Sequence, residues 1–440
     1  MKHQNILITA ILILFSSLTF PQENGDIIEV EFLESMSQQQ AQFQLNAIFG
    51  SVAPTALYDI SVYKIIYQTI DLQGEPVIAS GSVAFPQDEE TAFPLLSAQH
   101  GTEVLRDEVS SVYGFDAINM WLSAAGYITS YPDYLGMGES DIFHPYIIDQ
   151  PTATAVAHML IAAKQFCDDT EGLQYNDQLF LFGYSEGGYA TMATHRYLET
   201  HYPEEFTVTL STPMAGPYDL SETTLDAILS GAEYEMPYYV AFILMAYIEH
   251  YQLGPLTDFF TDYYASILPD LFDGYHPFWQ INAYLPSTPL DILRPEVLED
   301  LTNNEDHILR ILMAQNDNFD WTPIAPVYLY HGLGDESVPP ANSQVAYDTI
   351  SDNGGEVYLQ LFPASLGGHG PVALYCIMAG SAVIYDNTHF NEKGDINGDL
   401  IIDVLDIVQL VAIIMGTAIA DSYQLWASDI NLDGLIDVLD

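Results

Sequence analysis

Residues 179–190 read Leu179-Phe180-Leu181-Phe182-Gly183-Tyr184-Ser185-Glu186-Gly187-Gly188-Tyr189-Ala190. An apolar run typical of a buried strand leads into Gly-x-Ser-x-Gly and then into the start of a helix. The glycines around Ser185 permit a tight strand-to-helix turn that raises the serine hydroxyl clear of the backbone. Such a serine is typical of a nucleophile, and the N–H of Glu186 at the helix N-terminus points to where an oxyanion would form.

A serine nucleophile needs a base, and the base needs a carboxylate that orients it. Two later strand-like runs end in loops that supply these groups, Asp335 in the Gly-rich loop 331–339 and His369 in the loop 363–370. Parallel strands bring their carboxyl ends to one edge of a sheet, so we expect both side chains near Ser185. Glu336 is the alternative acid.

A second oxyanion donor is expected from the loop after the strand-like run 93–98, which reads His100-Gly101-Thr102. Gly101 allows the backbone to approach closely, and either Gly101 or Thr102 could donate its N–H.

Strand-like and helical patterns alternate along most of the chain. Strands are expected at 63–70, 77–85, 93–98, 127–131, 178–182, 206–210, 327–330 and 356–362, and helices at 152–167, 190–200, 342–351 and 371–385. This alternation predicts an α/β fold, a mostly parallel sheet flanked by helices, with a hairpin at 63–85 adding antiparallel pairing at one edge. Residues 217–322 carry no convincing strand but many aromatic residues in helical patterns, so they are expected to form a cap inserted between two strands.

Several motifs together resemble a known family. They are His100-Gly101-Thr102, Asp133-Tyr134-Leu135-Gly136-Met137-Gly138-Glu139-Ser140 followed by His144-Pro145-Tyr146, and Gly183-Tyr184-Ser185-Glu186-Gly187-Gly188. With the helical cap, they resemble the α/β-hydrolase superfamily, and within it the secretory lipase family, over residues 50–386. The resemblance implies an α/β-hydrolase fold and a carboxylester hydrolase with a Ser185, Asp335 and His369 triad. Glu186 departs from the Gln that members of that family often carry.

Two similar acidic segments follow a polar linker near the C-terminus. Oxygen ligands at loop positions 1, 3, 5, 7 and 12 suit a hard cation such as calcium. The predicted ligands are Asp395, Asn397, Asp399, Ile401 and Asp406 in the first loop and Asp429, Asn431, Asp433, Leu435 and Asp440 in the second. Leu400 stands at position 6 of the first loop, where glycine is expected. The pair resembles dockerin type I repeats, which implies a small EF-hand-like all-α module and a cohesin-like or cell-surface partner.

The sequence divides into three expected parts. Residues 1–20 combine a charged start, a short apolar run and small residues, as a secretory signal peptide does. A hydrolase domain at 21–390, with its cap at about 217–322, precedes the calcium-binding module at 394–440. The chain stops at Asp440, before a second exit helix, so this module is expected to be truncated. Cys167 and Cys376 are expected to be two buried thiols rather than a disulfide.

The charge balance excludes one group of partners. Eight Lys and Arg residues stand against 61 Asp and Glu residues in 440, a net charge of −53, which repels nucleic acid and anionic membranes. The main hypothesis is a secreted or surface-attached serine esterase or lipase acting on esters or acylglycerols, with structural calcium in the tail and no cofactor for catalysis. A prolyl-type serine peptidase or an acyltransferase could use the same triad. A calcium-dependent surface scaffold with a silent hydrolase domain is the non-enzymatic alternative.

Overall fold

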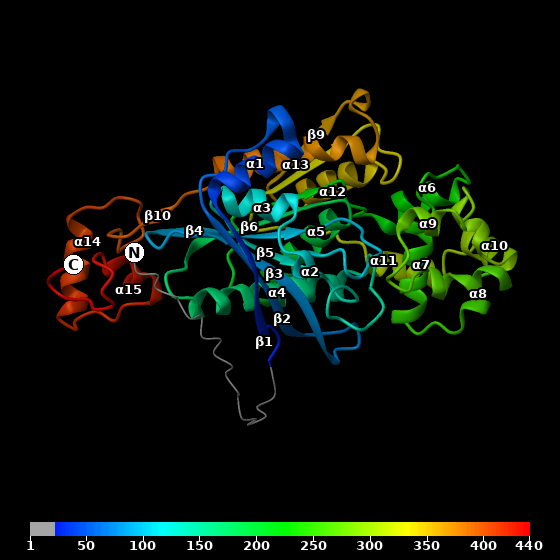
Figure 1. Ribbon diagram of the computed structural model, residues 1–440. Helices are drawn as coiled ribbons and strands as arrows, with labels where there is room; N and C mark the ends of the chain where they lie inside the picture. The colour runs from blue at the N-terminus through cyan, green and yellow to red at the C-terminus, as the bar shows by residue number, and fades with distance from the viewer. Residues whose placement is uncertain (1–22) are drawn as a thin grey trace.

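A mixed β-sheet runs through the centre of the protein. The computed structural model describes residues 23–440, so the signal peptide predicted at residues 1–20 lies outside the described residues. The sheet order is β1-β2-β3-β5-β4-β6-β7-β8-β9, and β10 pairs with β4 (Figure 1). The strands are β1 Ile27–Met36, β2 Ile60–Ile70, β3 Pro76–Pro86, β4 Thr91–Gln99, β5 Ile128–Pro132, β6 Gln174–Tyr184, β7 Leu210–Met214, β8 Val327–Gly332, β9 Val357–Phe362 and β10 Asn391–Glu392.

The strand pairing confirms a mixed sheet and corrects two expectations. From β5 through β9 all neighbours along the order are parallel, whereas β1, β2 and β3 are antiparallel. The predicted hairpin β2–β3 does not lie at the edge, because β1 pairs outside β2. The strand predicted at 206–210 was wrong, since β7 begins at Leu210. Phe206 and Val208 are apolar because they are buried under the sheet from a loop.

Helices cover both faces of the sheet. On one face α4 (Asp149–Asp169), α5 (Glu186–His201) and α12 (Ala341–Asp352) pack against β-strand side chains. On the other face lie α1 (Gln38–Phe49), α3 (Ala117–Ala124) and α13 (His369–Asp386). The short α2 (Ser110–Tyr113) lies near β2 and β3. This arrangement brings the loops that follow β4, β6, β8 and β9 to one edge of the sheet.

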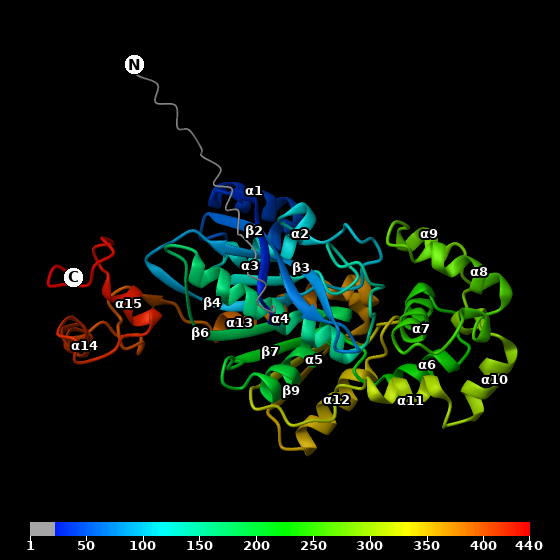
Figure 2. The ribbon, with the colours of Figure 1, turned by 90° about the horizontal axis from the view of Figure 1, so that it is seen from below.

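The segment between β7 and β8 forms the expected helical cap, at one end of the molecule (Figures 1 and 2). Its α-helices are α6 Leu225–Leu229, α7 Tyr238–His250, α8 Asp262–Leu271, α9 Phe278–Asn282, α10 Pro295–Asn303 and α11 Ile308–Gln315. The α7 helix is apolar on nearly all sides and is buried among the others, as a helix without a polar face must be. The cap therefore has its own hydrophobic core, resting on Tyr146 to Ile148 of the hydrolase body.

The C-terminal segment lies at the opposite end from the cap (Figure 1). It holds α14 (Val404–Ile414), α15 (Ser422–Ser428) and two loops, around a small core of Ile396, Leu410 and Ala427. Lys393 joins its parts, since its ammonium donates to the carbonyl oxygens of Trp426 and Asp429. The indole N–H of Trp426 donates to the Glu89 carbonyl oxygen and so attaches this segment to the hydrolase body.

Both cysteines are buried free thiols, as the sequence indicates. Cys167 belongs to the core under α4, and Cys376 to the core on the other face of the sheet, under α13. Within residues 23–440 no helix combines the length and apolarity that a membrane crossing needs.

The packing of α1 gives a stability prediction. Leu45 is fully buried between α1 and α3, so Leu45→Ala should leave a cavity and lower the free energy of unfolding by about 2–5 kcal/mol. Urea unfolding followed by circular dichroism measures the change. Leu57→Ala, at a side chain that is 53% exposed, is the control and should cost less than about 1 kcal/mol. Equal losses in the two variants would contradict the packing described here.

Candidate active site

Ser185 occupies the turn between β6 and α5. Its φ of 63° lies in the left-handed region that non-glycine residues seldom adopt, and its backbone N–H donates to the Met214 carbonyl oxygen at 2.9 Å. A Cβ on Gly183 would collide with the backbone of Gly187, and one on Gly187 would collide with the backbone of Gln99. Glycine is therefore required on both sides of Ser185, and the turn holds the hydroxyl above the carboxyl edge of the sheet.

Ser185, His369 and Asp335 form one hydrogen-bonded chain. His369 Nε2 lies 2.9 Å from Ser185 Oγ, and His369 Nδ1 lies 2.6 Å from Asp335 Oδ2. The three residues follow β6, β9 and β8, so three neighbouring loops bring them together. All three side chains are largely buried.

Asp335 is held by hydrogen bonds on both carboxylate oxygens. Oδ1 accepts from the N–H groups of Ser337 and Val338, and Oδ2 faces His369 and His331, whose Nε2 lies 3.2 Å away. Burial by itself would raise the pKa of Asp335, but the hydrogen bonds from His331 and His369 outweigh it and hold this pKa well below its usual range. Asp335 is therefore a carboxylate at neutral pH.

The neighbouring acid has a different place. Glu336 Oε2 accepts the backbone N–H of His369 at 3.1 Å and makes no recorded contact with the imidazole. Glu336 thus steadies the first turn of α13, while Asp335 faces the ring. His331, near the end of β8, is held at both ring nitrogens: its Nδ1 faces Ser343 Oγ at 2.8 Å and its Nε2 also faces the Val338 carbonyl oxygen. That contact with an acceptor makes Nε2 the donor toward Asp335 as well.

The predicted oxyanion donors lie around Ser185. Glu186 is the first residue of α5, so its backbone N–H has no acceptor within the helix. Gly101 passes close to the nucleophile, since a Cβ there would lie 3.9 Å from Ser185 Cβ. Thr102 turns its hydroxyl to Tyr146 Oη at 2.8 Å. The His100 ring faces the carbonyl oxygens of Gly101 and Asp133 and braces this loop.

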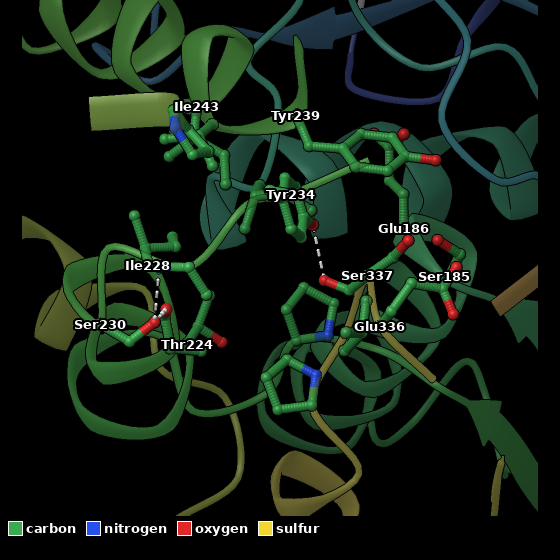
Figure 3. A pocket seen from close by; sticks show the side chains of 18 of the residues that line it. Ser185, Glu186, Thr224, Ile228, Ser230, Tyr234, Tyr239, Ile243, Glu336 and Ser337 are labelled. Carbon is green, nitrogen blue, oxygen red and sulfur yellow. Dashed lines mark hydrogen bonds between the residues drawn. The ribbon is translucent and has the colours of Figure 1, made fainter. Parts of the chain in front are cut away.

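A cavity opens between Ser185 and the cap, with an empty volume of about 1010 Å³ including space open to solvent. Figure 3 shows Ser185, Glu186, Glu336 and Ser337 on one side and the cap residues Ile228, Tyr234, Tyr239 and Ile243 on the other. The phenol of Tyr234 donates to the Ser337 carbonyl oxygen at 2.6 Å and ties the cap to the loop that bears Asp335. The cap aromatics therefore serve two purposes, some in the cap core and some in the wall of the cavity.

A second, smaller cavity inside the cap shares part of this wall. Its lining is wholly apolar apart from one tyrosine, and Ile228, Val240 and Ile243 border both cavities.

The Glu186 side chain makes a buried contact that the sequence did not predict. Its Oε1 lies 2.8 Å from His144 Nε2, and His144 Nδ1 lies 2.7 Å from the Leu135 carbonyl oxygen. Only 2% of Glu186 and 5% of His144 is exposed, and Glu186 Oε2 has no hydrogen-bond partner. His144 and His331 are 41 and 146 residues away from Ser185 in the sequence, so spacing gave no signal for either role. The one available signal was that each lies beside a Gly-rich loop, His144 after residues 136–138 and His331 just before residues 332–334.

The two acidic loops share one backbone conformation. In both loops the side chain at position 1 accepts the N–H groups of positions 5 and 6, and the side chain at position 12 accepts those of positions 2 and 3. Positions 4 and 6 have positive φ in both, with Gly398 and Leu400 in the first loop and Leu432 and Gly434 in the second. Leu400 thus adopts the conformation expected of glycine. Within residues 23–440, no three His, Cys, Asp or Glu side chains converge closely enough to hold a metal ion.

No protein-family model and no curated protein matches this sequence. Solved structures do match. A protein from Legionella pneumophila, provisionally assigned as a hydrolase, is 28% identical with a TM-score of 0.76, over 82% of this chain and 98% of the other. The rice cell wall degrading esterase LipA from Xanthomonas oryzae is 26% identical with a TM-score of 0.75, over 83% of this chain and all of the other. Candida antarctica lipase A in its closed state is 15% identical with a TM-score of 0.64, over 83% of this chain and 82% of the other, and is similar in fold alone.

These similarities support an α/β-hydrolase fold of the lipase-like kind. They also support a hydrolase of the esterase or lipase kind, that is, one acting on carboxylic esters.

The low pKa of Asp335 gives a pH-dependent stability prediction. Its folded-state pKa is depressed, so its contribution to stability is present above the unfolded pKa of about 3.9 and is lost as the pH falls toward the folded value. Asp335→Asn should therefore lower the free energy of unfolding by about 1.5–3 kcal/mol near neutral pH. The gap between the wild-type and variant free energies should narrow below about pH 4. Urea titrations at several pH values measure it. The exposed Asp270→Asn is the control, and a gap that stays constant with pH would refute the prediction.

Proposed function

We propose that this protein is a secreted serine carboxylester hydrolase, an esterase or lipase. The observation that carries the proposal is the hydrogen-bonded chain from Ser185 through His369 to Asp335, at the floor of a cavity under the cap. The esterase structure similar to this chain supports it.

The reaction follows from the contacts. Ser185 Oγ attacks the ester carbonyl carbon as its proton passes to His369 Nε2, and Asp335 stabilises the imidazolium that forms. The carbonyl π electrons move to the oxygen, which the N–H of Glu186 and an N–H of Gly101 or Thr102 stabilise. When the ester C–O bond breaks, the alcohol takes the proton from His369 and leaves an acyl-serine. Water, deprotonated by His369, then releases the acid and restores Ser185.

The cavity supports an ester with an apolar acyl group. Ile228, Val240 and Ile243 line the cap side, and beyond them lies the apolar second cavity. The hydroxyl and carboxyl groups of Ser230, Glu233 and Ser337 line other parts of the main cavity, where a polar alcohol portion could lie. Esters and acylglycerols are therefore the proposed substrates.

Replacement of the nucleophile tests the proposal. Ser185→Ala should lower kcat on p-nitrophenyl esters by at least about 10³-fold, because no other group would form the acyl intermediate. The matched control is Ser381→Ala, since the Ser381 hydroxyl bonds to its own helix at the Ile377 carbonyl oxygen. Hydrolysis by Ser185→Ala at the wild-type rate would overturn the assignment.

The same assay separates the alternatives. A series of p-nitrophenyl esters of rising acyl length measures the acyl preference. Turnover of Pro-containing peptides and not of esters would instead favour a prolyl-type peptidase. Transfer of the acyl group to an added alcohol in preference to water would favour an acyltransferase. An intact fold that turns over none of these substrates would favour a calcium-dependent scaffold.

A second proposal concerns the C-terminal loops, which we propose bind calcium. All the predicted ligands would donate oxygen atoms, which fits a hard cation. In both loops the N–H of position 5 donates to the carboxylate of position 1, so the two loops turn in the same way. Three acidic side chains do not converge in either loop. Asp395, Asn397, Asp399, Ile401 and Asp406 would hold one ion, and Asp429, Asn431, Asp433, Leu435 and Asp440 the other. Bound calcium would supply positive charge that offsets the repulsion between the loop carboxylates. It would also stabilise α14 for docking to a surface partner.

Calcium titration of the full chain tests this second proposal. Isothermal titration calorimetry should find two sites, and thermal melting should rise on addition of calcium and fall on addition of EDTA. Asp406→Asn and Asp440→Asn should each remove one site, while Asp270→Asn should remove none. Melting temperatures that calcium and EDTA leave unchanged would count against a role for the loops in calcium binding.

The proposed extracellular location rests on residues 1–20 and is supported by the similarity to a cell wall degrading esterase. Exposed apolar side chains of α14, among them Val404, Ile407 and Val408, are the proposed contact surface of the tail for a cohesin-like or cell-surface partner.

A further inference from the structure

A buried acid stands directly after the nucleophile, in a site where negative charge must develop. Glu186 lines the cavity beside Ser185, as Figure 3 shows, and its backbone N–H is a proposed oxyanion donor. A bare carboxylate at this point would oppose the oxyanion, because like charges in a poorly solvated site repel strongly. How the Glu186 carboxyl is neutralised therefore matters for ester hydrolysis.

The contacts of His144 fix where its protons lie. His144 Nδ1 is 2.7 Å from the Leu135 carbonyl oxygen, which can only accept, so Nδ1 carries a hydrogen. His144 Nε2 is 2.8 Å from Glu186 Oε1. If the imidazole were neutral and the carboxyl ionised, two lone pairs would face each other at that distance. One proton must therefore lie between Nε2 and Oε1, and with it the pair has no net charge, whichever atom holds the proton.

We propose that His144 and Glu186 hold one shared proton that keeps the oxyanion end of the site free of net charge, and that loss of this proton as the pH is raised stops ester turnover. The inference rests on the proposed function. His144 and Glu186 are positioning residues here, since they act on the oxyanion through charge and through the placement of the Glu186 N–H. The orphan Oε2 of Glu186 agrees with this assignment, because a charged carboxylate oxygen buried without a donor would be costly.

The pair also borders a second cavity. His144 also lines a separate, more open cavity of about 670 Å³ with Arg106, Asp141 and Asp273. Arg106 is paired with Asp141 at 2.7 Å, and Asp273 with His276 at 2.9 Å.

Other titratable groups surround the pair, and their effects on the pH profile must be distinguished from that of the pair. Burial raises the pKa of Glu103 to about 7, with the charge of His100 opposing the shift and that of Glu108 adding to it. Burial raises the pKa values of the nearby tyrosines above their usual range, which keeps them protonated, and lowers that of His250 to about 4, which keeps it neutral. The groups that face the pair or its immediate neighbours are Glu103, Tyr134, Tyr146, Tyr239, His250, His100, Arg106, Asp141, Asp273 and His369.

The pH profile of kcat/KM tests the proposal. Hydrolysis of a short p-nitrophenyl ester is followed at the isosbestic wavelength from about pH 6 to about pH 10, with the Ser185→Ala rate subtracted. The wild type should lose about tenfold in kcat/KM per pH unit above the titration of the pair. Glu186→Gln should lose this alkaline fall, because the Gln amide N–H can donate to His144 Nε2 with no proton to lose. An alkaline fall that remains at the wild-type midpoint in folded Glu186→Gln would overturn the inference.

A reciprocal variant keeps the test decisive if Glu186→Gln does not fold. His144→Gln leaves Glu186 as a lone acid, so activity should be low at neutral pH, rise toward acid pH, and recover in the His144→Gln, Glu186→Gln double variant. A loss that is equal at all pH values and not recovered in the double variant would mean a merely structural role and would overturn the inference.

Two further variants separate this inference from a titration of Glu103 and from the proposed function. Glu103→Gln should keep the alkaline fall, and disappearance of the fall there would assign it to Glu103 and overturn the inference. Full activity in Ser185→Ala would defeat the proposed function itself. An inactive Ser185→Ala together with an unchanged pH profile in Glu186→Gln would defeat this inference alone.

Discussion

The turn at Ser185 is the constraint on which the site depends. A non-glycine residue held at φ 63° is unfavourable by itself and persists only where its surroundings enforce it. They do so here through the bond from the Ser185 N–H to Met214 O and through the contact of Gly187 with Gln99. Ser185 is thus fixed by backbone from β4, β6 and β7 together. The same parallel register sets the loops after β8 and β9 beside it, so the positions of Asp335 and His369 follow from the sheet.

Much of this arrangement could be predicted from the sequence because it depends on local patterns. The alternation of strand-like and helical runs predicted the sheet and the helices that cover it. Residues 183–188 predicted the strand-to-helix turn at Ser185. The order of Ser185, Asp335 and His369 along strand ends gave residues that lie within hydrogen-bond distance. Glu336, one position from Asp335, showed the limit of this reasoning, since only the turn geometry decides which carboxylate meets the ring.

The parts that sequence reasoning did not reach depend on contacts between distant segments. The edge strand β1 pairs through its backbone, and its side chains remain exposed at Ile28, Val30 and Phe32, so it lacks the pattern of a buried strand. The strand at β7 was placed too early because Phe206 and Val208 are buried from a loop. His144 meets Glu186 only because the loop after β5 folds back over the start of α5.

The charge composition explains why histidine is so prominent around the site. The chain has eight Lys and Arg residues for 61 acids, but it has 12 histidines. Most ion pairs of the described residues join an acid to a histidine, and both buried acids that contact a ring near Ser185 follow this rule, Asp335 with His369 and His331 and Glu186 with His144. Histidine differs from Lys and Arg because it can lose its charge near neutral pH. A site neutralised in this way depends on protons rather than on permanent cations, so the chemistry proposed for Ser185 is expected to be sensitive to pH.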